Sequence, residues 1–150
     1  MLPADSTVLG FDVGSRRIGV AIGSAFAVQA RAIGVVDVRA DGPDWAAVER
    51  MFKDWRPQGL IVGDPLTLDG KDQPNRGRAR HFARQLAQRF KVPVLMVDER
   101  SSSVEAARRF ANERAQGQKR RRDAANLDAV AAAVIIERWL TCPGDATPIS

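Results

Sequence analysis

The order of apolar segments constrains the fold more than any other feature of this sequence. Three strand-like segments come first, between Val8 and Val38, with a tight turn around Gly14-Ser15 after the first. Helix-like and strand-like segments then alternate, and "GLIVGDPL" and "VPVLMVDE" are typical of buried parallel strands. This order predicts an α/β fold: a mixed five-stranded sheet, with an antiparallel meander beside parallel strands, flanked by helices.

Helical patterns occupy the intervening stretches. In "GPDWAAVERMFKDWRP" the apolar residues recur at helical spacing, with Asp44 as a possible N-cap and Pro57 as a stop. The other helical patterns are "RGRARHFARQLAQRF", "SVEAARRFANERA" and the apolar "LDAVAAAVIIERWL", the last preceded by the loop-like "QGQKRRRDAAN". We expect a single domain over residues 1–150, with an ordered core at about 8–140 and a loose tail at 141–150.

The composition restricts the location of the protein and the metals it can bind. No apolar run approaches the roughly 20 residues of a membrane span, and "MLPADSTV" is not a secretory signal. One cysteine, Cys142, and one histidine cannot form a Cys/His zinc site. We therefore expect a cytoplasmic protein without a membrane partner, in which any metal is a hard cation such as Mg²⁺ or Mn²⁺ held by carboxylates.

The charge balance favours an anionic partner. The chain has 23 Lys and Arg against 18 Asp and Glu, a net charge of +5, and arginine outnumbers lysine. Arginine binds phosphate in a bidentate manner, so nucleic acid is the expected partner, although Arg-rich and Ala-rich composition also follows from a GC-rich genome. The run Lys119, Arg120, Arg121 and Arg122 is either a contact for a nucleic-acid backbone or a solvated loop.

Acidic residues interrupt three apolar segments. Asp12 lies within the first strand pattern, Asp98 and Glu99 close the last one, and Asp128 lies at the start of the final helix. If these segments meet, three carboxylates share one site, and their repulsion calls for a divalent cation. Each acid also has a simpler interpretation: Asp128 or Asn126 caps the helix, Asp12 accepts hydrogen bonds from the turn, and Glu99 pairs with Arg100 at the surface.

Four segments together indicate a family. "GFDVGSRRIGVA", "IVGDPLTLDG", "VDERSSSVEA" and "LDAVAAAVII" occur in this order and at matching spacing. They closely resemble the motifs of the YqgF/RuvX family, ribonuclease-H-like proteins described as Holliday junction resolvases or pre-16S rRNA nucleases. The resemblance covers about Val8 to Leu140. It implies one ribonuclease-H-like domain whose acidic residues act on nucleic acid through a divalent metal.

The resemblance also implies roles for individual residues. Asp12, Glu99 and Asp128 match the family's acids and are the expected catalytic and metal-binding residues, with Asp98 and Asp64 as secondary acids. The residues placed to contact nucleic acid are Arg16, Arg17, Arg100 and the basic run from Lys119 to Arg122, and Gly14 would let a phosphate approach the backbone closely. The chain departs from the family pattern at Asp64, where a small apolar residue is usual, and at Ser101, Ser102 and Ser103, which replace a threonine-containing run.

The implied function is a metal-dependent nuclease that hydrolyses phosphodiester bonds of structured nucleic acid, with 5′-end processing of pre-16S rRNA in ribosome biogenesis as its expected role. Alternatives are a Holliday junction resolvase acting on four-way DNA junctions and a non-catalytic nucleic-acid-binding factor. The Asp-x-Gly motif also opens actin-like ATPases, but these need a second lobe for which 150 residues leave no room. The expected oligomeric state is a monomer or a weak homodimer, since a junction resolvase would pair two sites by two-fold symmetry.

Overall fold

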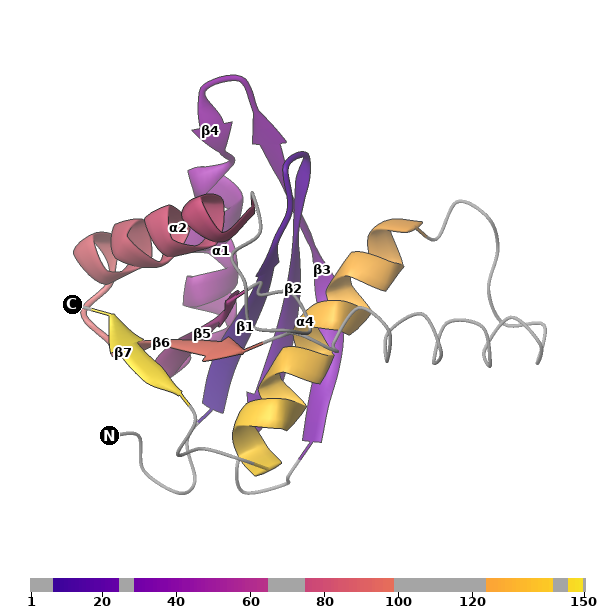
Figure 1. Cartoon of the computed structure of the whole chain (residues 1–150), viewed down its shortest axis with the longest axis vertical. Coiled ribbons are helices and arrows are strands. Elements are labelled where there is room, and N and C mark those ends of the chain that lie inside the picture. Colours follow the sequence, from indigo (N-terminus) through magenta and orange to yellow (C-terminus); the bar gives the residue numbers. More distant parts are fainter. Residues whose placement is uncertain (1–6, 25–28, 65–74, 99–123, 142–145, 150) are drawn as a thin grey trace.

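The described part of the chain is a twisted sheet with helices on both faces (Figure 1). The computed structural model describes residues 7–24, 29–64, 75–98, 124–141 and 146–149. Helices α1 (Trp45–Trp55) and α2 (Asn75–Arg89) cover one face of the sheet, and α4 (Ala124–Thr141) lies across the other.

Seven strands form the sheet, and their directions follow the predicted pattern. From edge to edge they are β4 (Gly42–Pro43), β3 (Gln29–Arg39), β2 (Arg17–Ser24), β1 (Thr7–Val13), β5 (Gly59–Asp64), β6 (Val94–Asp98) and β7 (Thr147–Ile149). β1, β2 and β3 are an antiparallel meander, whereas β1, β5 and β6 run parallel. The mixed sheet predicted from the sequence is confirmed, with all five expected strands present.

Two short edge strands were not expected. β4 has two residues and pairs with the end of β3, which is a contact too short to leave an alternating pattern. β7 has three residues and pairs antiparallel with β6, Ile149 lying opposite Val94. The sequence suggested a loose tail, but residues 147–149 form an ordered strand. They cover the backbone groups on the open edge of β6, and Ile149 packs against the core.

The helices follow the sequence pattern, with one shifted boundary. The carboxylate of Asp44 accepts a hydrogen bond from the Ala47 amide at 3.3 Å, which confirms the N-cap of α1. α1 ends at Arg56, whose left-handed backbone lets its amide bond the Phe52 carbonyl at 2.8 Å. α4 begins at Ala124, earlier than expected, so Asn126 and Asp128 lie inside the helix and do not cap it. The helix expected over residues 103–115 lies outside the described residues.

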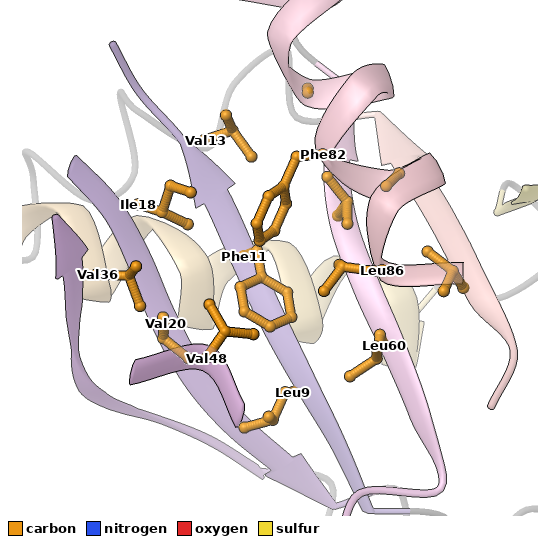
Figure 2. Packing of buried hydrophobic residues seen from close by; sticks show 14 of the residues in the cluster. Leu9, Phe11, Val13, Ile18, Val20, Val36, Val48, Leu60, Phe82 and Leu86 are labelled. Carbon is orange, nitrogen blue, oxygen red and sulfur yellow. The ribbon is translucent and has the colours of Figure 1, made fainter. Parts of the chain in front are cut away.

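Each face of the sheet has its own hydrophobic core. Between the sheet and α1 and α2, Phe11 meets Phe82 edge-on with ring centroids 5.2 Å apart (Figure 2). On the other face, α4 packs on the strands through small and branched residues. α4 approaches β1 so closely at Gly10 that a Cβ there would lie 2.5 Å from Ile136 Cγ1 and 3.2 Å from the Ala132 carbonyl oxygen. Glycine is therefore required where α4 crosses β1.

None of the helices in the described ranges is both long and apolar enough to cross a lipid bilayer.

Candidate active site

Asp12 lies near the carboxyl end of β1, on the sheet face covered by α4. Its neighbours Phe11 and Val13 belong to the core under α1 and α2, whereas Val8 belongs to the core under α4. Because successive strand residues face opposite sides, Asp12 shares the α4 face with Val8 and Gly10. It is partly exposed, in a strand whose other residues beyond Thr7 are buried. The expected acid is thus at the end of the parallel strands, where sites in such sheets gather.

Glycines flank Asp12 on both neighbouring strands. Asp12 is paired with Gly19 of β2. On the other side β1 and β5 are in register up to Phe11 and Val62, and one further step aligns Asp12 with Gly63. Neighbouring strands lie about 4.8 Å apart, and glycine adds no side chain at the two positions level with Asp12.

α4 begins at the same end of the sheet as Asp12. α4 contacts β1 at Gly10 through Ala132 and Ile136, and it runs from the end of the sheet at the β1–β2 hairpin towards the start of β1 (Figure 1). Asp12 is two residues beyond Gly10, about 6.6 Å along the strand. Asp128 is four residues before Ala132, about 6 Å along the helix towards the same end. Both positions therefore lie on the hairpin side of the point where α4 crosses β1 (Figure 1).

Arg17 lies on the same face as Asp12. It is two residues before Gly19 on β2, which makes it the diagonal cross-strand neighbour of Asp12, a separation of about 7–8 Å. Arg17 is exposed and is paired across the sheet with Asp37, an exposed acid on β3. The exposed Arg16 is in the hairpin itself, where its carbonyl accepts a hydrogen bond from the Val38 amide at 2.9 Å. The two arginines therefore lie at the hairpin end of the sheet, next to the face that carries Asp12.

The geometry of the β1–β2 hairpin requires glycine at position 14, whether or not a phosphate binds there. The Gly14 amide donates to the Arg17 carbonyl at 2.9 Å, and a Cβ at position 14 would lie 2.7 Å from that oxygen. The close approach that the sequence suggested for a ligand is thus made within the turn. Gly14 fixes the direction in which Arg16 and Arg17 leave the sheet.

Asp64 lies on the opposite face of the sheet from Asp12. Leu60 and Val62 of β5 belong to the core under α1 and α2, and Asp64 follows them on that side. Its carboxylate accepts hydrogen bonds from Arg76 Nε at 2.9 Å and from Arg76 Nη2 at 3.3 Å, and Arg80 Nη2 lies 3.9 Å away. Asp64 is only 15% exposed. Both arginines are on α2, so Asp64 fixes the start of that helix to the end of β5.

Only the backbone is described at Asp98 and at Asp128. Position 98 is paired with Asp64 across β5 and β6, and the preceding Val97 belongs to the core under α4. Glu99, Arg100, the serines at 101–103 and the basic residues at 119–122 lie outside the described residues. Within the residues whose side chains are described, no three His, Cys, Asp or Glu side chains gather into a metal-binding group. The described part of the site is thus Asp12, its two glycines and the hairpin arginines.

The comparison that decides the family covers almost the whole chain. A family model described as RuvX, Holliday junction resolvase, matches residues 6–142. The chain belongs to the RuvX family. Its Asp12, the hairpin arginines and the start of α4 all lie within the matched range.

Curated relatives of this RuvX chain carry one name. A "Putative pre-16S rRNA nuclease" of Xanthomonas axonopodis pv. citri (strain 306) is 68% identical over 143 residues, 95% of this chain and 92% of the relative. A protein with the same name from Xanthomonas euvesicatoria pv. vesicatoria (strain 85-10) is 66% identical over 145 residues, 97% of this chain and 94% of the relative. The relatives are thus matched along nearly their full length.

Solved structures confirm the fold. The RuvX chain resembles Thermus thermophilus RuvC in complex with a Holliday junction substrate, with a TM-score of 0.59 and 20% identity over 95% of this chain and 99% of that one. A second T. thermophilus RuvC structure matches with a TM-score of 0.52 and 19% identity, at the same coverage. The ribonuclease-H-like fold expected from the sequence is confirmed.

Two features of the RuvX site escaped the sequence analysis. Gly19 and Gly63 were read as parts of strand patterns, and only the register shows that they flank Asp12. A glycine inside an apolar strand does signal a close approach or a ligand, and this signal could have singled them out. Arg76 was also missed as the partner of Asp64, since the two are joined only by the packing of α2.

Proposed function

We propose that this protein is a divalent-metal-dependent nuclease that hydrolyses phosphodiester bonds of structured RNA, with the 5′ end of pre-16S rRNA as its substrate. The observation that carries the proposal is the carboxylate of Asp12 between Gly19 and Gly63 at the end of the parallel strands. A partly exposed acid at the end of the parallel strands, with glycines at both cross-strand positions, is suited to hold a cation and a phosphate. The curated relatives, matched along nearly their full length, carry the name of such a nuclease.

The donor chemistry fits a hard cation. Carboxylate oxygens are the ligands that Mg²⁺ and Mn²⁺ prefer, and the face around Asp12 offers a carboxylate where a side chain would otherwise pack. Asp12 and Asp128 would hold the ion, since both lie on the hairpin side of the crossing of α4 and β1 at Gly10. When bound, a divalent ion activates water and offsets charge on the phosphate oxygens. The protein's own part is to hold the acids at fixed separation on a rigid strand and helix.

Glu99 is the third acid of the proposed site. It closes the apolar segment "VPVLMVDE" and matches an acid of the family motif in "VDERSSSVEA". We therefore assign Glu99, together with Asp12 and Asp128, to the metal site, with Asp98 as a secondary acid. Asp64 is bound to Arg76 and Arg80 on the opposite face and stabilises the fold.

The hairpin arginines are placed to bind the phosphates beside the scissile bond. Arg17 lies diagonal to Asp12 on the same face, and Arg16 is exposed at the tip of the hairpin. Guanidinium groups bind phosphate oxygens in a bidentate manner and stay charged at every working pH. Arg100 and the basic run from Lys119 to Arg122 extend the same role along the bound strand. Such contacts position the nucleic acid without selecting its sequence.

A Holliday junction resolvase is the second candidate function. The family description names this activity, and the RuvC structure that resembles this chain holds a Holliday junction. A resolvase cuts two strands symmetrically and needs paired sites, whereas trimming an rRNA end needs only one. The described residues supply one acidic site per chain, and either role uses the same acids.

One experiment tests the proposal against its rivals. The purified protein is incubated with Mn²⁺ or Mg²⁺ and either a structured pre-16S rRNA fragment or a four-way DNA junction, with an equal amount of chelator as control. The proposal predicts metal-dependent cleavage of the RNA in preference to the junction. Preferred, symmetric cleavage of the junction would establish the resolvase instead. Tight binding of both substrates without cleavage, and no heat of Mn²⁺ binding by calorimetry, would establish a non-catalytic binding factor.

A further inference from the structure

A small pocket opens on the sheet face opposite Asp12, at the same end of β1. Its floor is apolar and includes Val13, Ile18 and Phe82 (Figure 2), and Arg78, His81 and Gln85 of α2 contribute polar groups. Val13 directly follows Asp12, so the pocket and the carboxylate lie on the two sides of one strand end. Neither the metal site nor the hairpin contacts proposed above use this pocket.

The side chains at the base of the pocket are fixed by packing, and the pocket has room for one ring system. Its volume is about 110 Å³. This is the space of a few water molecules and well below the roughly 300 Å³ at which drug-sized ligand sites begin, so a whole nucleotide or cofactor is excluded. Phe82 is held edge-on by Phe11 at 5.2 Å and stacked on Trp45 at 5.3 Å. Phe82 is only 2% exposed, so it makes the base of the pocket firm and apolar, and the ring that a flat guest can stack on is that of the exposed His81.

The charged residues around the pocket indicate which class of molecule carries the flat group that binds there. α2 carries five arginines and no acidic residue over Asn75–Arg89. Arg76 and Arg80 pair with Asp64 and Arg89 pairs with Glu49, so Arg78 is the arginine of α2 that lines the pocket. None of the described residues that line the pocket is acidic, and the exposed Arg16 and Arg17 adjoin it across Gly14. Such a surface attracts a polyanion. A nucleic-acid strand has both the negative charge and the flat ring, since each nucleotide carries a phosphate and a base.

We propose that this pocket binds one unpaired base of the substrate strand, next to the phosphate held at Asp12. Unpaired bases are recognised by stacking on aromatic, histidine and arginine side chains and by hydrogen bonds to their edges. The exposed His81 supplies the stacking surface, Gln85 the donor and acceptor, and Arg78 a contact for the adjoining phosphate, while the buried Phe82 forms the base of the pocket. The inference rests on the proposed nuclease function and makes it specific: the substrate is single-stranded at the cut.

The test uses a short single-stranded RNA in the presence of chelator, so that binding is measured without cleavage. An abasic nucleotide is moved through the RNA one position at a time. The wild-type protein should lose affinity by about 5-fold to 150-fold at one position, the range that the loss of one stacked base gives. His81→Ala and Gln85→Ala should bind the intact RNA more weakly and show no further loss at that position. Gln88→Ala, at an exposed position of α2 outside the pocket, is the matched control and should behave as the wild type.

Two results would overturn the inference. The first is a wild-type affinity that does not change with the position of the abasic nucleotide. The second is equal RNA affinity of His81→Ala, Gln85→Ala and Gln88→Ala. Either result would favour a side chain of a protein partner as the occupant of the pocket. Thermal melting of each variant shows whether the fold is retained. If metal-dependent cleavage persists while the scan is flat, the base pocket fails and the nuclease stands. If the scan succeeds without any cleavage, the nuclease proposal fails and the pocket stands.

Discussion

Asp12 of β1 lies directly across from Gly19 of β2, and this pair defines the site. Opposite residues in an antiparallel pair have Cβ positions about 5 Å apart, so any side chain at position 19 would stand beside the carboxylate. Gly63 leaves the same space on the β5 side. The glycine pair adds no side chain at the positions level with Asp12, as the proposed binding of a cation and a phosphate there requires.

Gly19→Ala should therefore lower the rate of cleavage. Neither Gly19 nor Gly63 is among the residues with positive φ, so alanine is compatible with the backbone, and replacing a strand glycine removes its entropic cost. We expect cleavage to fall by about 10-fold to 100-fold, because the added methyl would stand where the proposed phosphate binds, and thermal melting shows whether the buried position accepts it. Unchanged kcat in a correctly folded Gly19→Ala variant would show that the space beside Asp12 is not used.

Gly10→Ala should destabilise the fold. The new Cβ would meet Ile136 Cγ1 at 2.5 Å and Cδ1 at 2.7 Å, forcing α4 away from β1. Overpacking of this kind costs about 1–3 kcal/mol in the free energy of unfolding, measured by urea titration. The double variant Gly10→Ala, Ile136→Val should recover part of the loss. Gly77→Ala is the matched control: its Cβ would meet nothing within 4 Å, and we expect a gain of about 0.5–1 kcal/mol.

Asp64→Asn should lower stability and leave cleavage intact. The variant removes the charge that Arg76 and Arg80 share at the start of α2, and we expect a loss of about 1–2 kcal/mol in the free energy of unfolding. Glu49→Gln removes an exposed pair with Arg89 at 3.7 Å and should change stability by less than about 0.5 kcal/mol. The opposite pattern for Asp64→Asn, in which cleavage is lost and stability gained, would place Asp64 in the metal site.

Local sequence patterns predicted most of the fold. Apolar periodicity identified β1, β2, β3, β5, β6 and the described helices, and Asp44 identified the start of α1. The edge strands β4 and β7 escaped, because pairings of two or three residues depend on an open neighbouring edge and leave no pattern of their own. The start of α4 was placed too late because Ala124 and Ala125 follow a highly charged run that reads as a loop.

The acids could be predicted from the sequence because they interrupt apolar segments. The sheet face on which each acid lies could not be predicted. Asp12 and Asp64 both end parallel strands at one edge, and the sequence alone grouped them. The pleat places Asp12 on the α4 face and Asp64 beside Arg76 on the α2 face. A one-residue change in register would exchange these faces, and register is set by tertiary packing. The pocket beneath α2 was hidden for the same reason.

The most direct measurement is the rate of Mn²⁺-dependent cleavage of a structured pre-16S rRNA fragment by the wild type and by Asp12→Asn. Asparagine keeps the shape of the side chain and removes its charge, so both proteins should melt at similar temperatures. We expect the rate to fall by about 10²-fold to 10⁴-fold, the effect of losing several kcal/mol of metal-derived stabilisation. Cleavage by Asp12→Asn at the wild-type rate and with the same metal dependence would contradict the central role of Asp12.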